Sequence, residues 1–213
     1  MSQTSRTYLP AAGHDGFLPF YDLIVKLIGG ESARKTLIER ATLRPHQRVL
    51  DIGCGTGTMG VVIKRLHPDV EVVGLDPDPK ALARARRKAL HAGVSIQFNQ
   101  GFADQLPYAQ GSFDRVLSSF MFHHLKAEER ARTLEAIRRV LKPGGELHLL
   151  DFEGPEDKSR IFLQRLFHSN ERLKDNSAKR ILALMSQAGF ASAQKVGRKR
   201  LLLGTVAYYR ATE

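Results

Sequence analysis

The chain has 213 residues, of which 42% are hydrophobic and 26% charged, a composition typical of one soluble globular domain with a buried core. It has no apolar run near the roughly 20 residues that span a bilayer, and the N-terminus lacks the apolar core of a secretory signal. We therefore predict a cytoplasmic location. A single cysteine, Cys54, excludes an internal disulfide and a zinc site of several thiolates, and no metal is predicted.

The net charge of +11 is unusual for such a chain. A basic surface attracts anionic partners such as nucleic acid, phospholipid head groups or acidic metabolites. A solvated basic surface without any partner explains the charge equally well, so the charge alone leaves the partner open.

The chain begins with two helical patterns, at residues 16–30 and 31–43, that stand outside the repeat that follows. Aromatic rings exclude water and stabilise cations. We expect residues 1–34 to form a lid over a substrate pocket, with candidate substrate contacts at Tyr8, His14, Phe17 and Tyr21. The alternative, in which these rings only fix the first helix to the rest of the domain, stays open.

From residue 48 onward, short apolar runs alternate with amphipathic patterns, as in repeated βα units around a parallel sheet. Strands are expected at residues 48–53, 70–76, 94–100, 113–119 and in the segment 141–151. We expect the helix before the fifth strand to end at Pro143 and Gly144. The inward-facing residues of the helices after the first and fourth strands are predicted to be Met59, Val62, Ile63, Leu66, Leu134, Ile137 and Leu141.

The C-terminal part of the chain departs from this repeat. A helix near residues 177–188 ends at Gly189, and two strand patterns follow, separated only by the basic residues 198–200. Such a link is too short for a crossover, so the last two strands are predicted to form an antiparallel hairpin.

The stretch VLDIGCGTGTMG, residues 49–60, combines a strand, a glycine-rich turn and the start of a helix. Glycines at 53, 55 and 57 let a ligand approach the backbone, whereas Gly60 falls inside the helix and suits close packing. The spacing differs from the G-x-G-x-x-G of dinucleotide sites. Asp51 would repel a pyrophosphate but accept hydrogen bonds from a cation, which favours a positively charged nucleoside. Asp76, which ends the second strand, stands where such sites place a carboxylate on the ribose hydroxyls.

With these motifs, residues 35–210 resemble the class I S-adenosylmethionine-dependent methyltransferases. The matching stretches are VLDIGCGTG, GLDPD, GFADQLPY, FDRVLSSFMFHHL and RVLKPGGELHLLD, in that order. The resemblance implies an α/β fold: a Rossmann-like, doubly wound, seven-stranded sheet of order 3-2-1-4-5-7-6 with strand 7 antiparallel, helices on both faces and an N-terminal helical lid. It implies one methyltransferase domain over residues 1–213, with the lid at 1–34 and the catalytic core at 35–213.

The resemblance also implies S-adenosyl-L-methionine as the cofactor. Its predicted contacts are Asp51, Gly53, Gly55, Thr56, Gly57, Asp76, Pro77, Phe102, Ala103, Asp104 and Ser118. One motif departs from the family, since the adenine loop usually reads Gly-Asp-Ala and here reads Gly101, Phe102, Ala103. We expect Phe102 to pack on the adenine, leaving Asp104 or a backbone group to read the amine.

The sulfonium makes the methyl group electrophilic, so the protein need only align a nucleophile in line with the S–CH₃ bond, exclude water and, where required, remove a proton. Strands 4 and 5 end beside the reacting methyl in a doubly wound sheet. His123 and His124, which follow strand 4, are therefore candidate general bases or positioning residues. The alternative that they only cap the strand stays open.

Motifs that the sequence lacks disfavour several classes of methyl acceptor. No Asn/Asp-Pro-Pro-Tyr/Phe stretch follows strand 4, Cys54 lies in the cofactor loop, and no RNA-binding domain is appended, so nucleic acid is disfavoured. The motifs resemble the small-molecule branch that includes quinone, sterol and phospholipid methyltransferases. We predict methyl transfer to O, N, S or C of a small acceptor. The alternatives are action on a lipid or quinone at an anionic membrane, an RNA methyltransferase, and a non-catalytic cofactor-binding subunit; the oligomeric state stays open.

Overall fold

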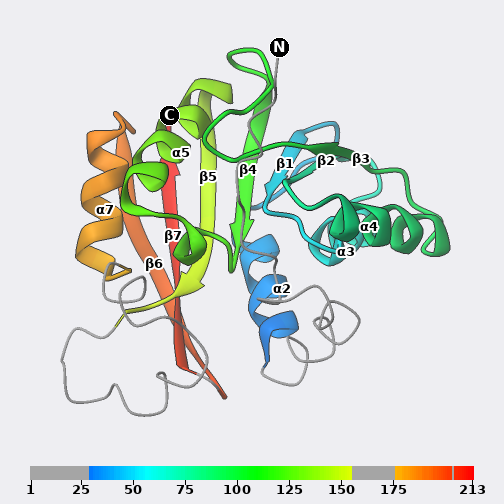
Figure 1. Cartoon of the computed structure of the whole chain (residues 1–213), viewed down its shortest axis with the longest axis horizontal. Helices are drawn as coiled ribbons and strands as arrows, with labels where there is room; N and C mark the ends of the chain where they lie inside the picture. The colour runs from blue at the N-terminus through cyan, green and yellow to red at the C-terminus, as the bar shows by residue number, and fades with distance from the viewer. Residues whose placement is uncertain (1–28, 155–175, 203) are drawn as a thin grey trace.

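A computed structural model describes residues 29–154, 176–202 and 204–213, and its strands form one sheet of order β3-β2-β1-β4-β5-β7-β6 (Figure 1). Strand β7 is antiparallel to both β5 and β6, whereas the pairs among β1 to β5 are parallel. The predicted sheet order and direction are confirmed. The strands are β1 (Arg48–Ile52), β2 (Glu71–Asp76), β3 (Gln97–Gln100), β4 (Phe113–Ser119), β5 (Leu141–Phe152), β6 (Ser192–Leu201) and β7 (Gly204–Thr212).

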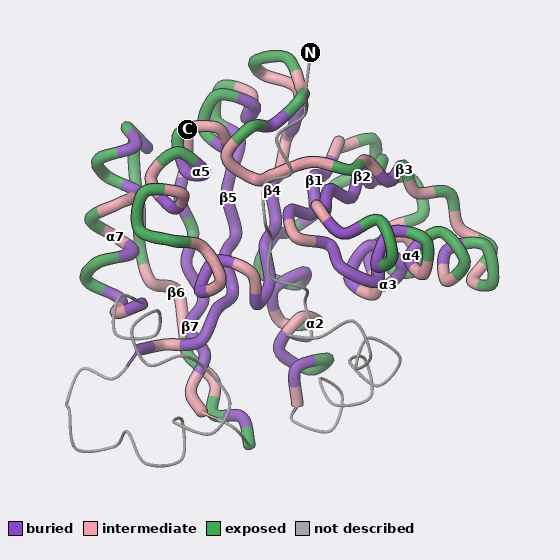
Figure 2. The backbone as a smooth tube through the Cα atoms, viewed as in Figure 1, coloured by how far each residue is buried: buried purple, intermediate pink, exposed green. Residues whose placement is uncertain are grey.

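Helices cover both faces of this sheet. They are α2 (Gly30–Arg40), α3 (Thr58–Leu66), α4 (Pro79–His91), α5 (Ala127–Val140) and α7 (Ala178–Gln187), with a short 3₁₀ helix, η2 (Phe122–His124), after β4. Successive strand residues point to opposite faces, so Leu50 packs in one buried cluster with α5 and α7, while Val49 packs in another with α2 and α3. Figure 2 shows the resulting buried strands between more exposed helices.

The junction between α5 and β5 differs from the prediction. Helix α5 ends at Val140, before Pro143, and Leu141 is already the first residue of β5, opposite Phe113 of β4. The register then shifts, so that Arg115 pairs with Glu146. Residues 142–145 therefore bulge out of the ladder, which is how the strand accommodates Pro143, since proline has no N–H to donate.

The buried stripe of α3 also differs from the expected one. Met59 and Ile63 are buried as predicted, but Leu66 is 49% exposed and Val62 is only partly buried. Val61 is buried instead, in a cluster with Leu82 and other residues of α4. The buried face of α3 is therefore broader than predicted and rotated around the helix axis, because α3 packs on the sheet and also contacts both α2 and α4.

The predicted C-terminal hairpin is confirmed, but its turn lies elsewhere. The basic residues 198–200 belong to β6, which pairs with β7 up to Leu201 opposite Gly204. Strand β3 is also shorter than predicted, because it begins at Gln97. In the part of the chain that the structure describes, no helix has the length and apolarity needed to cross a membrane.

The N-terminal helix α2 crosses the predicted boundary between residues 34 and 35. Ala33 and Leu37 pack it against the core of the domain, in the same cluster as Met59 of α3. Residues 30–34 thus belong to a helix that packs in the buried cluster, and the division of the chain into a lid and a catalytic core stays a prediction.

Candidate active site

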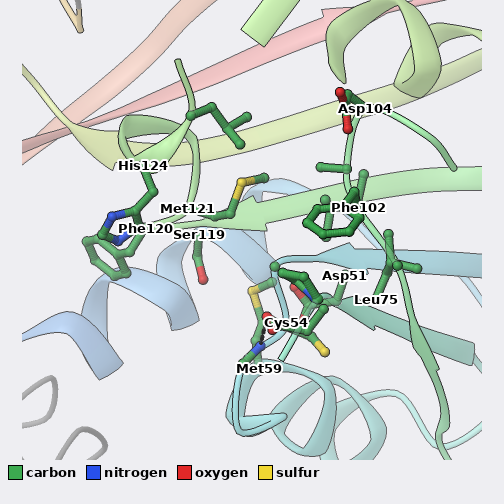
Figure 3. Close-up of a pocket in the computed structure, with 18 of the residues that line it drawn as sticks. Asp51, Cys54, Met59, Leu75, Phe102, Asp104, Ser119, Phe120, Met121 and His124 are labelled. Atoms are coloured by element: carbon green, nitrogen blue, oxygen red, sulfur yellow. Dashed lines mark hydrogen bonds between the residues drawn. The ribbon is translucent and has the colours of Figure 1, made fainter. Parts of the chain in front are cut away.

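A cavity of about 490 Å³ lies where β1, β2 and β4 end and the loop after β3 begins. This volume is within the range that binds small ligands and cofactors. Figure 3 shows its side chains in two groups. The glycine-loop side comprises Asp51, Gly53, Gly55, Asp76 and Phe102, and the β4 side comprises Arg34, Ser119, Phe120, Met121 and His124.

Asp51 on the glycine-loop side is a buried carboxylate without a hydrogen-bond partner among the described residues. Burial raises its pKa from 3.8 to about 7; the charge of Arg34 lowers the pKa and that of Asp76 raises it. An unpaired buried carboxylate is costly unless a cation or donor compensates it. Asp51 thus lines a cavity that suits a positively charged ligand.

Asp76 holds the glycine loop against the end of β2. One carboxylate oxygen accepts a hydrogen bond from the backbone N–H of Gly55 at 2.8 Å, and the other accepts from that of Asp78 at 2.9 Å. Burial raises the pKa of Asp76 to about 6, although both hydrogen bonds lower it. The carboxylate is therefore fixed beside Gly55 and Pro77, both of which line the cavity.

Two glycines of the loop are required for different reasons. At Gly53, φ is +69°, and an added Cβ would lie 2.4 Å from the Cγ of Met121, which also lines the cavity. At Gly57, φ is +75°, and a Cβ would lie 2.8 Å from the Cβ of Ala85 on α4. Gly57 is not among the described residues that line the cavity, whereas Gly53, Gly55 and Thr56 are. The third glycine therefore allows close approach of α4 to the loop.

The loop after β3 supplies Phe102, Ala103 and Asp104 to the same cavity, as expected for the adenine loop. The Asp104 carboxylate is almost fully buried and pairs with the half-exposed Arg132 of α5, with an O–N distance of 3.2 Å. Phe102 presents its ring to the cavity in Figure 3.

On the β4 side, the chain leaves the sheet in a strained conformation. Phe120 has a φ of +57°, which is uncommon for a bulky residue. Ser119, Phe120 and Met121 line the cavity. Ser118, the predicted contact, is buried and does not line it, because neighbouring strand residues point to opposite faces.

The two candidate histidines have different surroundings. His123 is buried, its Nδ1 lies 2.5 Å from an oxygen of Asp151, and its backbone N–H donates to the other oxygen at 2.8 Å. Burial raises the pKa of Asp151, but the charge and hydrogen bonds of His123 outweigh this effect and lower it overall. His124 lines the cavity, and the two imidazole rings lie 4.0 Å apart. His123 thus supports the site, while His124 faces it.

The sequence did not predict Arg34 and Met59 as cavity residues. Phe120 and Met121 also line the cavity, although the sequence predicted only that their segment lies beside the substrate. Arg34 comes from a helix before the βα repeat, and its helical spacing carries no signal that it faces a site. The predicted substrate contacts Tyr8, His14, Phe17 and Tyr21 lie outside the described residues.

These residues fit S-adenosylmethionine on physical grounds. The ligand carries a sulfonium and an ammonium group, and Asp51 offers a buried, uncompensated carboxylate. Asp76 is fixed at a strand end, where α/β folds bind ribose hydroxyls, and Phe102 offers an aromatic face. The expected contacts other than Gly57 and Ser118 converge on one cavity.

Comparisons with known proteins agree with this geometry. A family model described as a methyltransferase domain matches residues 49–145. The chain is 36% identical over 156 residues to a demethylmenaquinone methyltransferase of Thermus thermophilus, an alignment that covers 70% of each protein. A demethylmenaquinone methyltransferase of Deinococcus radiodurans is 37% identical over 140 residues, which are 64% of this chain and 57% of that protein.

A solved structure with the same fold is that of Haemonchus contortus phosphoethanolamine N-methyltransferase 2, in complex with phosphomonomethylethanolamine and S-adenosylhomocysteine. It matches with a TM-score of 0.77 and 18% identity, covering 94% of this chain and 58% of that one. At this identity the similarity concerns the arrangement of the sheet and helices alone.

Proposed function

We propose that the acceptor of this protein is a ring carbon of a hydroquinone. The chain belongs to the class I S-adenosylmethionine-dependent methyltransferases and methylates a small molecule. Two relatives are named for methylation of demethylmenaquinone. The observation that carries the proposal is the β4 side of the cavity, where Phe120 and Met121 form an apolar wall beside the polar groups of Arg34, Ser119 and His124. Such a wall fits a flat aromatic acceptor that carries hydroxyl groups.

The glycine-loop side binds and orients the cofactor in this proposal. Asp51 accepts its positive charge, Asp76 accepts hydrogen bonds from hydroxyls, and Phe102 packs on the base. When bound, S-adenosylmethionine supplies the methyl group: its S–CH₃ bond breaks, S-adenosylhomocysteine leaves, and the ring carbon that gains the methyl releases a proton.

The β4 side holds the acceptor and handles that proton. His124 faces the cavity, and imidazole is the side chain that most often moves a proton near neutral pH. His123 fixes the turn that presents it, since Asp151 holds both its ring and its backbone N–H. Phe120 and Met121 exclude water from the reacting atoms.

The test is methyl transfer from labelled S-adenosylmethionine to a prenylated naphthohydroquinone with a free ring carbon, with the product identified by mass. We expect one added methyl on carbon with the reduced acceptor and none with the oxidised quinone, because only the hydroquinone ring is nucleophilic. Cofactor binding without any methylated hydroquinone would overturn the acceptor class. Labelled-methyl transfer in fractionated cell extract would then identify another acceptor, and thermal stabilisation by the cofactor with no turnover on any acceptor would favour a non-catalytic subunit.

A membrane-bound acceptor is favoured by one feature of the C-terminal hairpin. Arg198, Arg200 and Leu202 are exposed, and Leu202 is 80% exposed at the turn. They occupy alternate positions that lead to the turn, so β6 presents two cations behind an apolar tip, an arrangement suited to anionic lipid. Figure 1 shows this hairpin tip at the same end of the sheet as α2.

Co-sedimentation with vesicles containing phosphatidylglycerol tests this arrangement. We expect binding at low salt that is lost at high salt, and weakened by Arg198→Gln combined with Arg200→Gln. Equal binding of this variant and the unmodified protein would contradict a role for the hairpin. A steep salt dependence of RNA binding that accompanies RNA methylation would favour the RNA alternative instead.

A further inference from the structure

We infer that Arg34 is the anion-binding residue of the acceptor site, so that the acceptor binds with a hydroxyl ionised to the phenolate. This inference deepens the proposed function and rests on it. The inference rests on the position of the Arg34 side chain. This half-buried guanidinium of α2 lies beside Ser119 and Phe120, where β4 ends.

Arg34 is held in place from the β4 side of the cavity. Its Nε donates a hydrogen bond to the Oγ of Ser119 at 3.2 Å, and its guanidinium carbon lies 5.5 Å from the centre of the Phe120 ring. These two contacts fix the plane of the guanidinium, which has five N–H donors in total. Ser119 uses one of these donors, on Nε, and Arg34 lines the cavity.

The charge of Arg34 is not neutralised by a neighbouring carboxylate among the described residues. No salt bridge joins it to an aspartate or glutamate in that part of the chain, although Arg132, Lys142 and Arg210 each have one. Its effect on Asp51 is weaker than that of burial, since the pKa of Asp51 stays at about 7. The guanidinium thus keeps a positive charge for a ligand.

The other titratable groups around the cavity do not compete equally for an anion. They are Asp51, Cys54, Asp76, Asp104, His124, Lys126 and Glu129. Lys126 is the other full cation among these described residues, but it is exposed, so solvent screens its charge. Asp104 pairs with Arg132, and Glu129 accepts from the backbone N–H of Lys126. Arg34 is therefore the cation best placed to bind an anion inside the cavity.

Ionisation of the acceptor serves the chemistry as well as binding. A phenolic hydroxyl ordinarily loses its proton near pH 10, as tyrosine does. An opposite charge within about 4 to 6 Å lowers such a pKa by about 1 to 3 units. The phenolate oxygen feeds electron density to the adjacent ring carbon, which then attacks an electrophilic methyl more readily. Arg34 thereby selects acceptors with an acidic hydroxyl next to the reacting carbon.

The test uses 4-nitro-1-naphthol as the probe, since its phenolate absorbs visible light and its phenol does not. The protein is loaded with S-adenosylhomocysteine, and the pKa of the bound probe is read from absorbance as the pH is varied. We expect the pKa of the bound probe to fall by about 1 unit relative to the free probe. Arg34→Gln should abolish this shift, Arg34→Lys should keep part of it, and Lys35→Gln should keep all of it. Lys35 is the matched control because it is the next residue of α2 and exposed.

Three results would each overturn the inference. The pKa shift of the bound probe could be unchanged in Arg34→Gln, it could be lost in Lys126→Gln instead, or the probe could fail to bind the unmodified protein. Thermal unfolding with S-adenosylhomocysteine shows whether Arg34→Gln is folded. If it is not, the inference is tested by the partial loss of the pKa shift in Arg34→Lys. The probe is read without methyl transfer, so a normal shift without methylation of naphthohydroquinone overturns the proposed function alone. A normal rate with no shift overturns the inference about Arg34 alone.

Discussion

The two sides of the cavity are built in different ways. On the glycine-loop side, Asp51, Gly53 and Gly55 lie within five residues of chain, and Asp76 reaches Gly55 from the end of the adjacent strand. On the β4 side, Ser119 meets Arg34 from 85 residues away, and His123 meets Asp151 from 28 residues away. The first side is set by local sequence and strand order, whereas the second depends on packing between distant elements.

The largest effect on cofactor affinity is expected at Gly53, where the two sides touch. Gly53→Ala adds a Cβ at a φ of +69° and 2.4 Å from Met121. The backbone strain costs about 1 to 2 kcal/mol and the overlap about 1 to 3 kcal/mol more. We expect the affinity for S-adenosylmethionine to fall by about 100-fold, equivalent to about 2.7 kcal/mol, as measured by calorimetry.

The control for this substitution is Gly93→Ala. Gly93 also has a positive φ, +66°, but no atom lies within 4 Å of the added Cβ. It should lose about 1 kcal/mol in the free energy of unfolding with no change in cofactor affinity. Equal affinities for Gly53→Ala and Gly93→Ala would show that the two sides are not coupled through Met121.

The contrast between the sides explains what the sequence could predict. Asp51 and Asp76 were predictable because each lies in the last two residues of a strand of a parallel sheet, where the strand order brings them together. Ser118 was chosen in place of Ser119 because a strand pattern does not say which face of β4 turns toward the cavity at its last residue. Arg34 was missed because a cation on an amphipathic helix is usually solvated, and only the packing of α2 near the end of β4 directs it inward.

A second test separates the two histidines of the β4 side. His123→Ala leaves Asp151 fully buried without its imidazole partner, so the free energy of unfolding should fall by about 3 to 5 kcal/mol. His124→Ala should leave thermal stability and cofactor affinity unchanged and lower turnover by at least about tenfold. Loss of less than about tenfold in turnover for both variants, with cofactor affinity intact, eliminates the general-base role.

A third test compares the two carboxylates of the glycine-loop side. Asp76→Asn replaces an oxygen that accepts from Gly55 or Asp78 by an amide group that cannot, and should weaken cofactor binding by about 10- to 30-fold. Asp104→Asn removes the charge that pairs with Arg132 and should weaken binding by no more than about threefold. Calorimetry that finds the opposite order would assign the main cofactor contact to Asp104.

The last test concerns the pH dependence that Asp51 contributes to stability and to cofactor binding. Its pKa rises from 3.8 to about 7 on folding, so between these values the folded chain holds a proton that the unfolded chain releases. The free energy of unfolding of the cofactor-free protein should therefore fall as the pH rises from 4 to 7, by at most about 4 kcal/mol. Asp76, with a pKa raised to about 6, acts in the same direction.

Cofactor affinity should change with pH in the opposite direction, because a cationic ligand binds the ionised form of Asp51. For a pKa of about 7, the ionised fraction rises from about 0.09 at pH 6 to about 0.91 at pH 8, so the affinity should rise by about tenfold. Calorimetry at constant ionic strength should find this slope in the unmodified protein and a flat profile in Asp51→Asn. If Asp51→Asn keeps the pH dependence of cofactor affinity and Asp76→Asn loses it, then Asp76 is the carboxylate that pairs with the positive charge of the cofactor. The unpaired oxygens of Asp51 then bind another ligand.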